Sequence, residues 1–151
     1  MTVKAEKAEG EKKKEEKAPK HIFFTGKRKK AVARATVKPG SGRVYINSQP
    51  LDQIRNETVR MLLQEPLALA GDAGKKFDLS VHTNGGGIMG QAQAARQAMA
   101  RGLVEMLGPS ARKAFLEYDR NILVYDPRRT EPHKPPRSSQ GPRRYKQRSK
   151  R

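Results

Sequence analysis

Apolar residues recur at regular intervals along most of the chain between residues 31 and 126. In residues 88–107 they recur every three or four positions, which predicts a long amphipathic helix with one apolar stripe. The members of this stripe are Ile88, Ala92, Ala95, Met99, Leu103 and Met106. The alanines are small enough to let this helix lie close against a sheet. Gln91, Arg96, Gln97 and Arg101 fall mostly on its other faces.

Three further stretches alternate apolar and polar residues, as β-strands do. AVARATV and RVYIN, at residues 31–37 and 43–47, are separated by PGSG and predict a β-hairpin. The segment KKFDLSVHTN alternates Phe77, Leu79 and Val81 and predicts another strand. NILVYD, at residues 121–126, predicts a last strand that Pro127 ends.

Two more helices are expected. Residues 51–63 carry apolar residues at helical spacing, so we predict a core-covering helix that Pro66 breaks and that closes near Gly71. Its apolar positions are Leu51, Ile54, Val59, Leu62 and Leu63. A short helix is expected to run from Ala114 to Tyr118.

No residue pattern points to catalysis or to a metal. The chain has no Cys, which excludes disulfides, thiolate metal ligands and a cysteine nucleophile. His82 has no second ligand or acid near it in sequence, so we interpret it as a surface or packed histidine. Asp119 and Asp126 have no His or Ser arranged beside them and are interpreted as turn and strand-end residues. We therefore predict a protein that is not an enzyme and has no cofactor.

The distribution of charge divides the 151 residues into parts. The formal net charge is +18, from 33 Lys and Arg against 15 Asp and Glu, which predicts polyanionic partners. Residues 20–43 contribute +8 and residues 127–151 contribute +9, whereas residues 44–126 are neutral. Residues 1–19 are a low-complexity Lys/Glu/Ala extension, expected to be disordered or transiently helical. We thus predict an extension (1–19), a globular domain (20–126) and an extended basic tail (127–151), whose prolines break helix and strand pairing.

No stretch of about 18 apolar residues and no secretory signal is evident, so we expect a soluble, cytosolic protein without a membrane partner.

Two motifs suit phosphate. No acidic residue lies between Lys20 and Arg43 to neutralise the run Lys27-Arg28-Lys29-Lys30, which favours phosphate contact over a merely solvated loop. Gly85-Gly86-Gly87 precedes the long helix, where exposed N–H groups and the helix dipole suit an anion. A plain tight turn, an RNA phosphate site and a nucleotide loop all remain open for these glycines. The nucleotide reading is the weakest, because GxxxxGK[ST] and GxGxxG spacings are missing.

Four segments, in this order and at these spacings, resemble the family of the universal ninth protein of the small ribosomal subunit. They are GKRKKAVARATVKPGSGRVYIN, GGGIMGQAQAARQAMARGL, YDPRRTEPHKPPR and the terminal SKR, and the resemblance covers roughly residues 22–151. The segments HTNGGGIMGQA and RRTEPHKP are similar to the archaeal branch of this family.

The resemblance implies an α+β fold, with a mostly antiparallel four-stranded sheet, helices packed on it and a βαβ crossover, as in the second domain of the fifth small-subunit protein. It also implies a ribonucleoprotein role in translation: a structural constituent of the small ribosomal subunit in the cytoplasm, bound to ribosomal RNA in the head beside neighbouring ribosomal proteins. The tip of the tail would contact the transfer RNA in the peptidyl site.

Carried onto this chain, the resemblance implies two sets of RNA-binding residues. The transfer RNA would meet Ser149, Lys150 and Arg151. The ribosomal RNA would meet Lys27, Arg28, Lys29, Lys30, Arg34, Gly85, Gly86, Gly87, Gln91, Arg96, Arg128, Arg129, Lys134, Arg137, Arg143 and Arg144.

The main alternative is an RNA-processing accessory protein of the ribonuclease P protein type, which shares the fold and the charge. It predicts RNA binding by the globular face with a dispensable tail. A kinase of the galactokinase type would need a Ser-rich loop that GGGIMGQ lacks, and a DNA-compacting protein would spread its Lys and Arg over one face.

Overall fold

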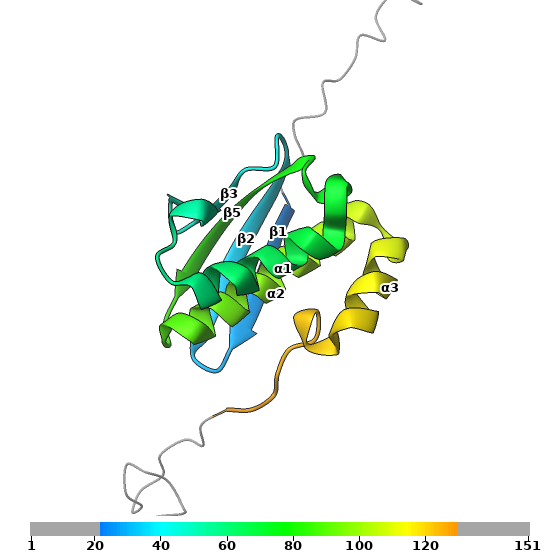
Figure 1. Ribbon diagram of the computed structural model, residues 1–151. Helices are drawn as coiled ribbons and strands as arrows, with labels where there is room; N and C mark the ends of the chain where they lie inside the picture. Colours follow the sequence, from blue (N-terminus) through cyan, green and yellow to red (C-terminus); the bar gives the residue numbers. More distant parts are fainter. Residues whose placement is uncertain (1–21, 130–151) are drawn as a thin grey trace, which may run out of the picture.

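Within residues 22–129, helices cover one face of a five-stranded sheet and none covers the other, which we call the open face (Figure 1). The computed structural model describes residues 22–129. Its strands are β1 (Ile22–Arg28), β2 (Ala31–Pro39), β3 (Val44–Ile46), β4 (Gln49–Pro50) and β5 (Phe77–Asn84). Its helices are α1 (Glu57–Gly74), α2 (Ile88–Leu107) and α3 (Pro109–Tyr118), with short 3₁₀ turns η1 (Leu51–Gln53) and η2 (Arg120–Ile122).

The sheet has the order β1-β2-β5-β3-β4. All neighbouring strands are antiparallel except β3 and β5, which are parallel and are joined through α1 on one face. This crossover and the mostly antiparallel pairing confirm the expected α+β class. The sheet has five strands rather than four, because the two-residue β4 adds an edge through a tight hairpin at Asn47 and Ser48, which both have positive φ.

The predicted hairpin between residues 31–37 and 43–47 is wrong, because β2 and β3 lie on opposite sides of β5. β2 pairs with β5 over eight positions, which gives it far more ladder hydrogen bonds than the three residues of β3 could supply. The actual partner of β2 on its other edge is β1, through a turn at Lys29, whose φ is 53°. The PGSG segment is instead a loop, in which the Asp78 carboxylate accepts N–H bonds from Ser41 (2.8 Å) and Arg43 (2.9 Å).

The predicted last strand at residues 121–126 is also wrong. Asp119 accepts a hydrogen bond from the Asn121 N–H at 2.8 Å, which begins the turn η2, and Ile122 is buried beside Phe115. The residues that follow η2 join no sheet among residues 22–129. The apolar run from Ile122 to Tyr125 resembles a buried strand, but Ile122 packs against Phe115 of α3 and Ala100 of α2 instead.

The predicted helix at residues 51–71 exists in a modified form. Asn56 caps α1 by accepting the Val59 N–H, and the helix runs through Pro66 without breaking. It deviates at Gly71, whose φ is 57°, and gains one further turn before ending at Gly74. The strand predicted around Phe77 and the short helix before residue 118 are confirmed by β5 and α3.

Small residues bring α2 close to the sheet, as its alanines predicted. Ala31, Ala33 and Ala35 of β2 are fully buried beneath it, and Ala92, Ala95, Met99 and Leu103 of α2 belong to the same core. At Gly26 of β1 a Cβ would lie 2.7 Å from the Ala98 nitrogen and closer still to the Ala94 carbonyl oxygen. Ile88 is an exception to the predicted stripe, because it is exposed at the first turn of the helix.

Candidate nucleic-acid interface

The basic run at the β1–β2 turn has two kinds of member. Lys27, Lys29 and Lys30 are exposed, and none of the three has an ion pair within residues 22–129. The guanidinium of Arg28 instead pairs with the carboxylate of Asp126, at the start of the tail. The turn therefore offers three uncompensated cations to a partner, while Arg28 connects the turn to the rest of the fold.

The glycine run lies directly against this basic turn. Gly85 and Gly86 adopt left-handed φ values of 74° and 67°, and a Cβ on Gly85 would lie only 2.7 Å from the Lys30 carbonyl oxygen. Such backbone contact requires glycine. The pairing of Val32 with Asn84 in the β2–β5 ladder sets this proximity. Two motifs that are more than fifty residues apart in sequence thus form one surface, a groove of about 410 Å³. It is lined by Arg28, Lys29, Lys30, Gly86, Gly87, Met89, Gly90 and Gln93.

The N-terminus of α2 opens into the same groove. Gly87 is the N-cap and supplies no side-chain cap, and the first intrahelical bond runs from the Gln91 N–H to the Gly87 carbonyl at 2.9 Å. The N–H groups of the first turn before Gln91 therefore have no intrahelical acceptor. Together with the helix dipole and Lys29 and Lys30, they form an electropositive site suited to phosphate.

Gln91 supports the glycine turn. Its Nε2 donates to the Gly85 carbonyl at 3.1 Å, and its Oε1 accepts the Thr83 hydroxyl hydrogen at 3.3 Å. Asn47 extends this network, because its Nδ2 donates to the Thr83 hydroxyl oxygen at 2.9 Å. The amide of Gln91 holds the glycine backbone in place beside the phosphate-suited groove.

Arg96 lies inside the fold. Its Nε is 2.5 Å from a Glu65 carboxylate oxygen of α1 and its Nη2 is 3.2 Å from Asp119, while its side chain is only 15% exposed. The Glu65 contact is a charge interaction without hydrogen-bond alignment. Arg96 thereby joins α1, α2 and η2, and its charge is already balanced by two carboxylates. Arg34 lies apart from this cluster, on the open face of the sheet opposite His82 in the β2–β5 register.

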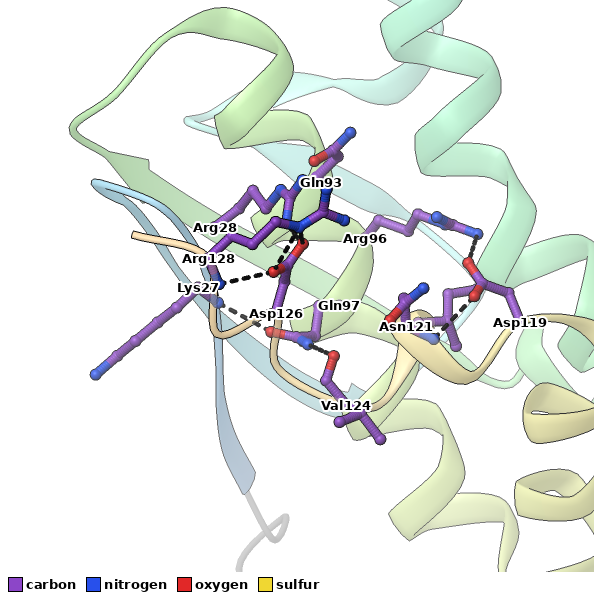
Figure 2. Close-up of a pocket in the computed structure, with 11 residues that line it drawn as sticks. Lys27, Arg28, Gln93, Arg96, Gln97, Asp119, Asn121, Val124, Asp126 and Arg128 are labelled. Carbon is purple, nitrogen blue, oxygen red and sulfur yellow. Dashed lines mark hydrogen bonds and ion pairs between the residues drawn. The ribbon is translucent and has the colours of Figure 1, made fainter. Parts of the chain in front are cut away.

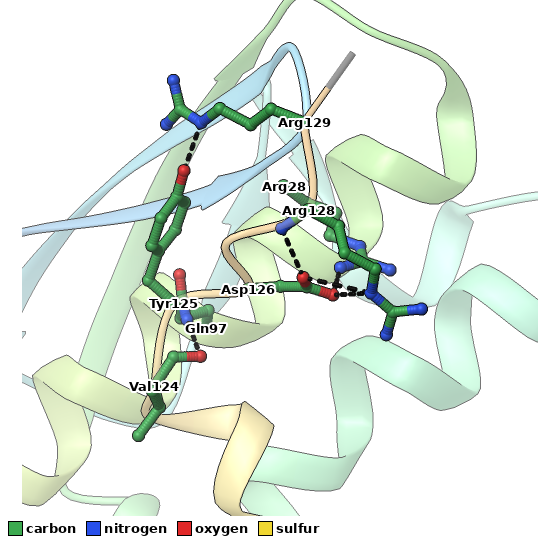
Figure 3. A network of polar contacts seen from close by, with 7 residues as sticks. All are labelled: Arg28, Gln97, Val124, Tyr125, Asp126, Arg128 and Arg129. Atoms are coloured by element: carbon green, nitrogen blue, oxygen red, sulfur yellow. Dashed lines mark hydrogen bonds and ion pairs between the residues drawn. The ribbon is translucent and has the colours of Figure 1, made fainter. Parts of the chain in front are cut away.

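A polar latch made of Gln97 and Arg101 attaches the segment after η2 to the fold, and Figures 2 and 3 show its Gln97 half. Gln97 is 5% exposed; its Oε1 accepts the Lys27 N–H at 3.0 Å and its Nε2 donates to the Val124 carbonyl at 2.8 Å. Arg101, one helical turn later, donates from Nε to the Leu123 carbonyl at 2.9 Å and from Nη1 to the Thr25 carbonyl at 2.8 Å. The latch connects α2 simultaneously to β1 and to the base of the tail.

Asp126 completes the attachment (Figure 3). Besides pairing with Arg28, it accepts the Arg128 N–H at 2.9 Å and lies 3.3 Å from the Arg128 Nε. Arg129 donates to the Tyr125 hydroxyl, and its guanidinium carbon lies 5.2 Å from the centre of that ring. Arg128 and Arg129 are therefore exposed at the tail base, each held by a contact with the residues just before it, Asp126 and Tyr125.

The sequence patterns identified the basic turn and the glycine run but not the latch. Gln97 and Arg101 are four residues apart, so they share a helix face, and this spacing is the single signal that could have marked them. The remaining predicted contacts lie outside the described residues. They are Lys134, Arg137, Arg143, Arg144, Ser149, Lys150 and Arg151.

Within residues 22–129, no three His, Asp or Glu side chains gather in a way that could hold a metal ion. In the same part of the chain no helix combines the length and the apolar character needed to cross a membrane.

Comparison with known proteins decides the family. Residues 26–151 match the model of a family described as ribosomal protein S9/S16. The chain belongs to this family. It is 46% identical to the small ribosomal subunit protein uS9 of Methanococcus maripaludis strain C7 over 131 residues, which cover 86% of this chain and 98% of that protein. It is 50% identical to the uS9 protein of Desulfurococcus amylolyticus over 116 residues, or 76% of this chain and 83% of that protein.

The uS9 protein of Methanococcus vannielii is 44% identical over 131 residues, with the same coverage as in M. maripaludis. These family members are archaeal, which agrees with the similarity of the glycine and tail segments to the archaeal branch. The family consists of structural ribosomal proteins rather than enzymes.

Proposed function

We propose that this chain, as a small-subunit ribosomal protein, binds ribosomal RNA through the basic turn, the glycine run and the tail, and that the tip of its tail contacts the transfer RNA in the peptidyl site. The observation that carries the proposal is the surface where Lys29 and Lys30 meet the uncapped N-terminus of α2. An RNA phosphate in that groove would gain both side-chain charge and backbone N–H donors.

The tail would extend the contact away from the globular domain. Arg128 and Arg129 would bind ribosomal RNA where the tail leaves the latch, followed by Lys134, Arg137, Arg143 and Arg144. Roughly 24 residues at about 3.3 Å each allow a reach of about 80 Å, enough to pass between RNA helices. Ser149, Lys150 and Arg151 would meet the transfer RNA at its end. Neutralised phosphates would offset the entropy lost when such a segment becomes ordered.

The globular residues of the proposed set have different roles. Lys27, Lys29, Lys30 and Arg34 would contact phosphates directly, because they are free of ion pairs in the described part of the chain. Arg28, Gln91 and Arg96 would act mainly through the shape of the surface, because each is already held by partners inside the fold. We further propose that neighbouring proteins of the subunit head and the cytoplasmic ribosome form the surroundings of the chain.

Sedimentation tests the proposal. Cell extract would be separated on sucrose gradients in moderate and then in high salt, with this chain followed by mass spectrometry. We expect stoichiometric migration with the small subunit that survives the high-salt wash. A chain that remains at the top of the gradient, or that leaves the subunit at modest salt, would contradict the proposal and favour the ribonuclease P-type alternative.

Two variants test the division of labour within the tail. Arg128→Ala with Arg129→Ala should lower incorporation into purified subunits, because the tail base loses two phosphate contacts. Removal of residues 149–151 should leave incorporation largely intact. Loss of incorporation upon the tip deletion would refute this division. If neither tail variant changes incorporation, the ribonuclease P-type alternative is favoured.

A further inference from the structure

The open face of the sheet carries an ordered row of side chains that the proposed contacts do not use. The register aligns Phe23 of β1 with Thr36 of β2, Thr36 with Ser80 of β5, and Ser80 with Tyr45 of β3. Side chains of one strand alternate between faces, and the neighbours of these residues along each strand point into the core beneath the helices. The row therefore lies on the side that no helix covers in Figure 1.

Aromatic rings stand at both ends of this row. Phe23 is 73% exposed and Tyr45 is 39% exposed, and small hydroxyl side chains lie between them. Three interstrand steps separate the two rings by about 14 Å, which is the length of about four stacked nucleotides.

A second row on the same face, two residues along each strand, consists of basic and polar side chains. Thr25 pairs with Arg34, and Arg34 pairs with His82. They adjoin a groove of about 660 Å³, whose lining is Lys30, Val32, Arg34, Asn47, His82, Thr83, Asn84 and Gly85. Lys30 lines both this groove and the groove at the glycine run, so the open face is continuous with the proposed RNA contact.

The open face has almost no opposing charge. Among the residues that the register places on it, the single carboxylate is Asp78, at the end of β5 far from the basic groove. Asp78 already accepts the N–H groups of Ser41 and Arg43. A polyanion approaching Arg34 would thus meet attraction without nearby repulsion.

We propose that the open sheet face binds a single-stranded segment of RNA, with bases stacked on Phe23 and Tyr45 and phosphates bound by Arg34 and Lys30. A duplex would not fit this chemistry, because its bases are already stacked and cannot lie on exposed rings. A polyanion fits better than a protein, because Arg34 and Lys30 line the adjoining groove without a carboxylate near them. This inference rests on the proposed RNA-binding function and adds to it the class of RNA that the sheet takes.

The absence of Trp from the chain makes a direct test possible. Phe23→Trp, Tyr45→Trp and Tyr118→Trp would each place one tryptophan in the full chain; Tyr118 is 56% exposed on α3 and serves as the matched control. Each variant would be titrated with a short oligouridine strand and with an RNA duplex of equal length. We expect base stacking to quench fluorescence at positions 23 and 45 with the single strand, little quenching with the duplex, and none at position 118.

Affinity gives a second readout. Phe23→Leu and Tyr45→Leu should each weaken oligouridine binding by about 5- to 140-fold, the range expected for one stacked base. Their salt dependence should not change, because no charge is lost. Tyr118→Leu should bind as the parent chain does. Unchanged far-UV circular dichroism would show that the variants fold.

The outcomes separate this inference from the proposed function. If Lys29→Ala with Lys30→Ala weakens binding to small-subunit ribosomal RNA while positions 23 and 45 show no quenching, the sheet proposal is overturned, and a protein neighbour becomes the better occupant. Equal quenching at all three positions indicates a nonspecific coat of RNA and also overturns it. If the parent chain binds neither oligouridine nor ribosomal RNA, the proposed function itself fails.

Discussion

Replacing Gln97 by leucine removes both hydrogen bonds of one half of the latch while nearly preserving side-chain volume. The Lys27 N–H and the Val124 carbonyl then lose their partners. An unsatisfied buried group costs about 1–3 kcal/mol, and the lower half of that range applies because both contacts are partly open to water. The pair thus costs about 2–4 kcal/mol, and burial of the leucine returns about 1 kcal/mol. The free energy of unfolding should fall by about 1–3 kcal/mol.

Urea unfolding followed by circular dichroism would measure this loss, and hydrogen exchange would locate it. Exchange of the Lys27 amide should accelerate, because its acceptor is gone. Gln93→Leu is the matched control, since Gln93 lies one turn earlier on α2 and makes no side-chain hydrogen bond within residues 22–129. It should change stability by no more than about 0.5 kcal/mol. A Gln97→Leu protein as stable as this control, with a protected Lys27 amide, would refute the reasoning.

Three further outcomes are expected. Gly26→Ala should destabilise the fold by about 3 kcal/mol or more in urea unfolding, because its Cβ would press into the backbone of α2 at Ala98. Asp78→Asn should be less stable than the parent at neutral pH. Backbone hydrogen bonds, first from Arg43, hold the pKa of Asp78 below its ordinary value, so the ionised carboxylate stabilises the fold above about pH 4. The difference in free energy of unfolding between the parent and Asp78→Asn should shrink as the pH falls through the lowered pKa of the folded state. Lys29→Ala should reduce the slope of log affinity for ribosomal RNA against log salt by about 0.7–0.9, and an unchanged slope would remove Lys29 from the interface.

Sequence patterns predicted those helices and strands in which apolar residues recur regularly because one side of the element packs on the core. β5 places Leu79 and Val81 on the core, and α2 buries a stripe from Ala92 to Leu103 after its exposed first turn, so the spacing of both elements is clear. Residues 121–126 show the limit of this approach, because their apolar run resembles a buried strand although Ile122 packs beside Phe115 of α3 from a 3₁₀ turn. The strand β1 was not predicted, because its exposed positions include the apolar Phe23 as well as Lys27, so apolar and polar residues do not alternate along it.

The candidate site was predictable in its components but not in its assembly. Charge and glycine runs are local features, so Lys27–Lys30 and Gly85–Gly87 could be recognised without a structure. Their contact depends on which strand lies beside β5, and the expected hairpin would have placed the basic turn elsewhere. The latch depends on carbonyl groups that lie 22 and 27 residues from Arg101 and Gln97, and backbone acceptors leave no trace in residue identity.

The latch has a consequence for how this part of the chain tolerates change. Gln97 and Arg101 bind the carbonyls of Val124 and Leu123 rather than their side chains, and every amino acid supplies a carbonyl. Substitutions at the exposed Val124 can therefore accumulate without moving the tail base, whereas Leu123 is also held by its packing against the cluster of Phe115 and Ile122. Insertion or deletion of one residue between Asp119 and Asp126 would instead shift every acceptor by one position and detach Arg128 and Arg129 from their place. The length of this segment is thus constrained along with its buried and paired residues Ile122 and Asp126.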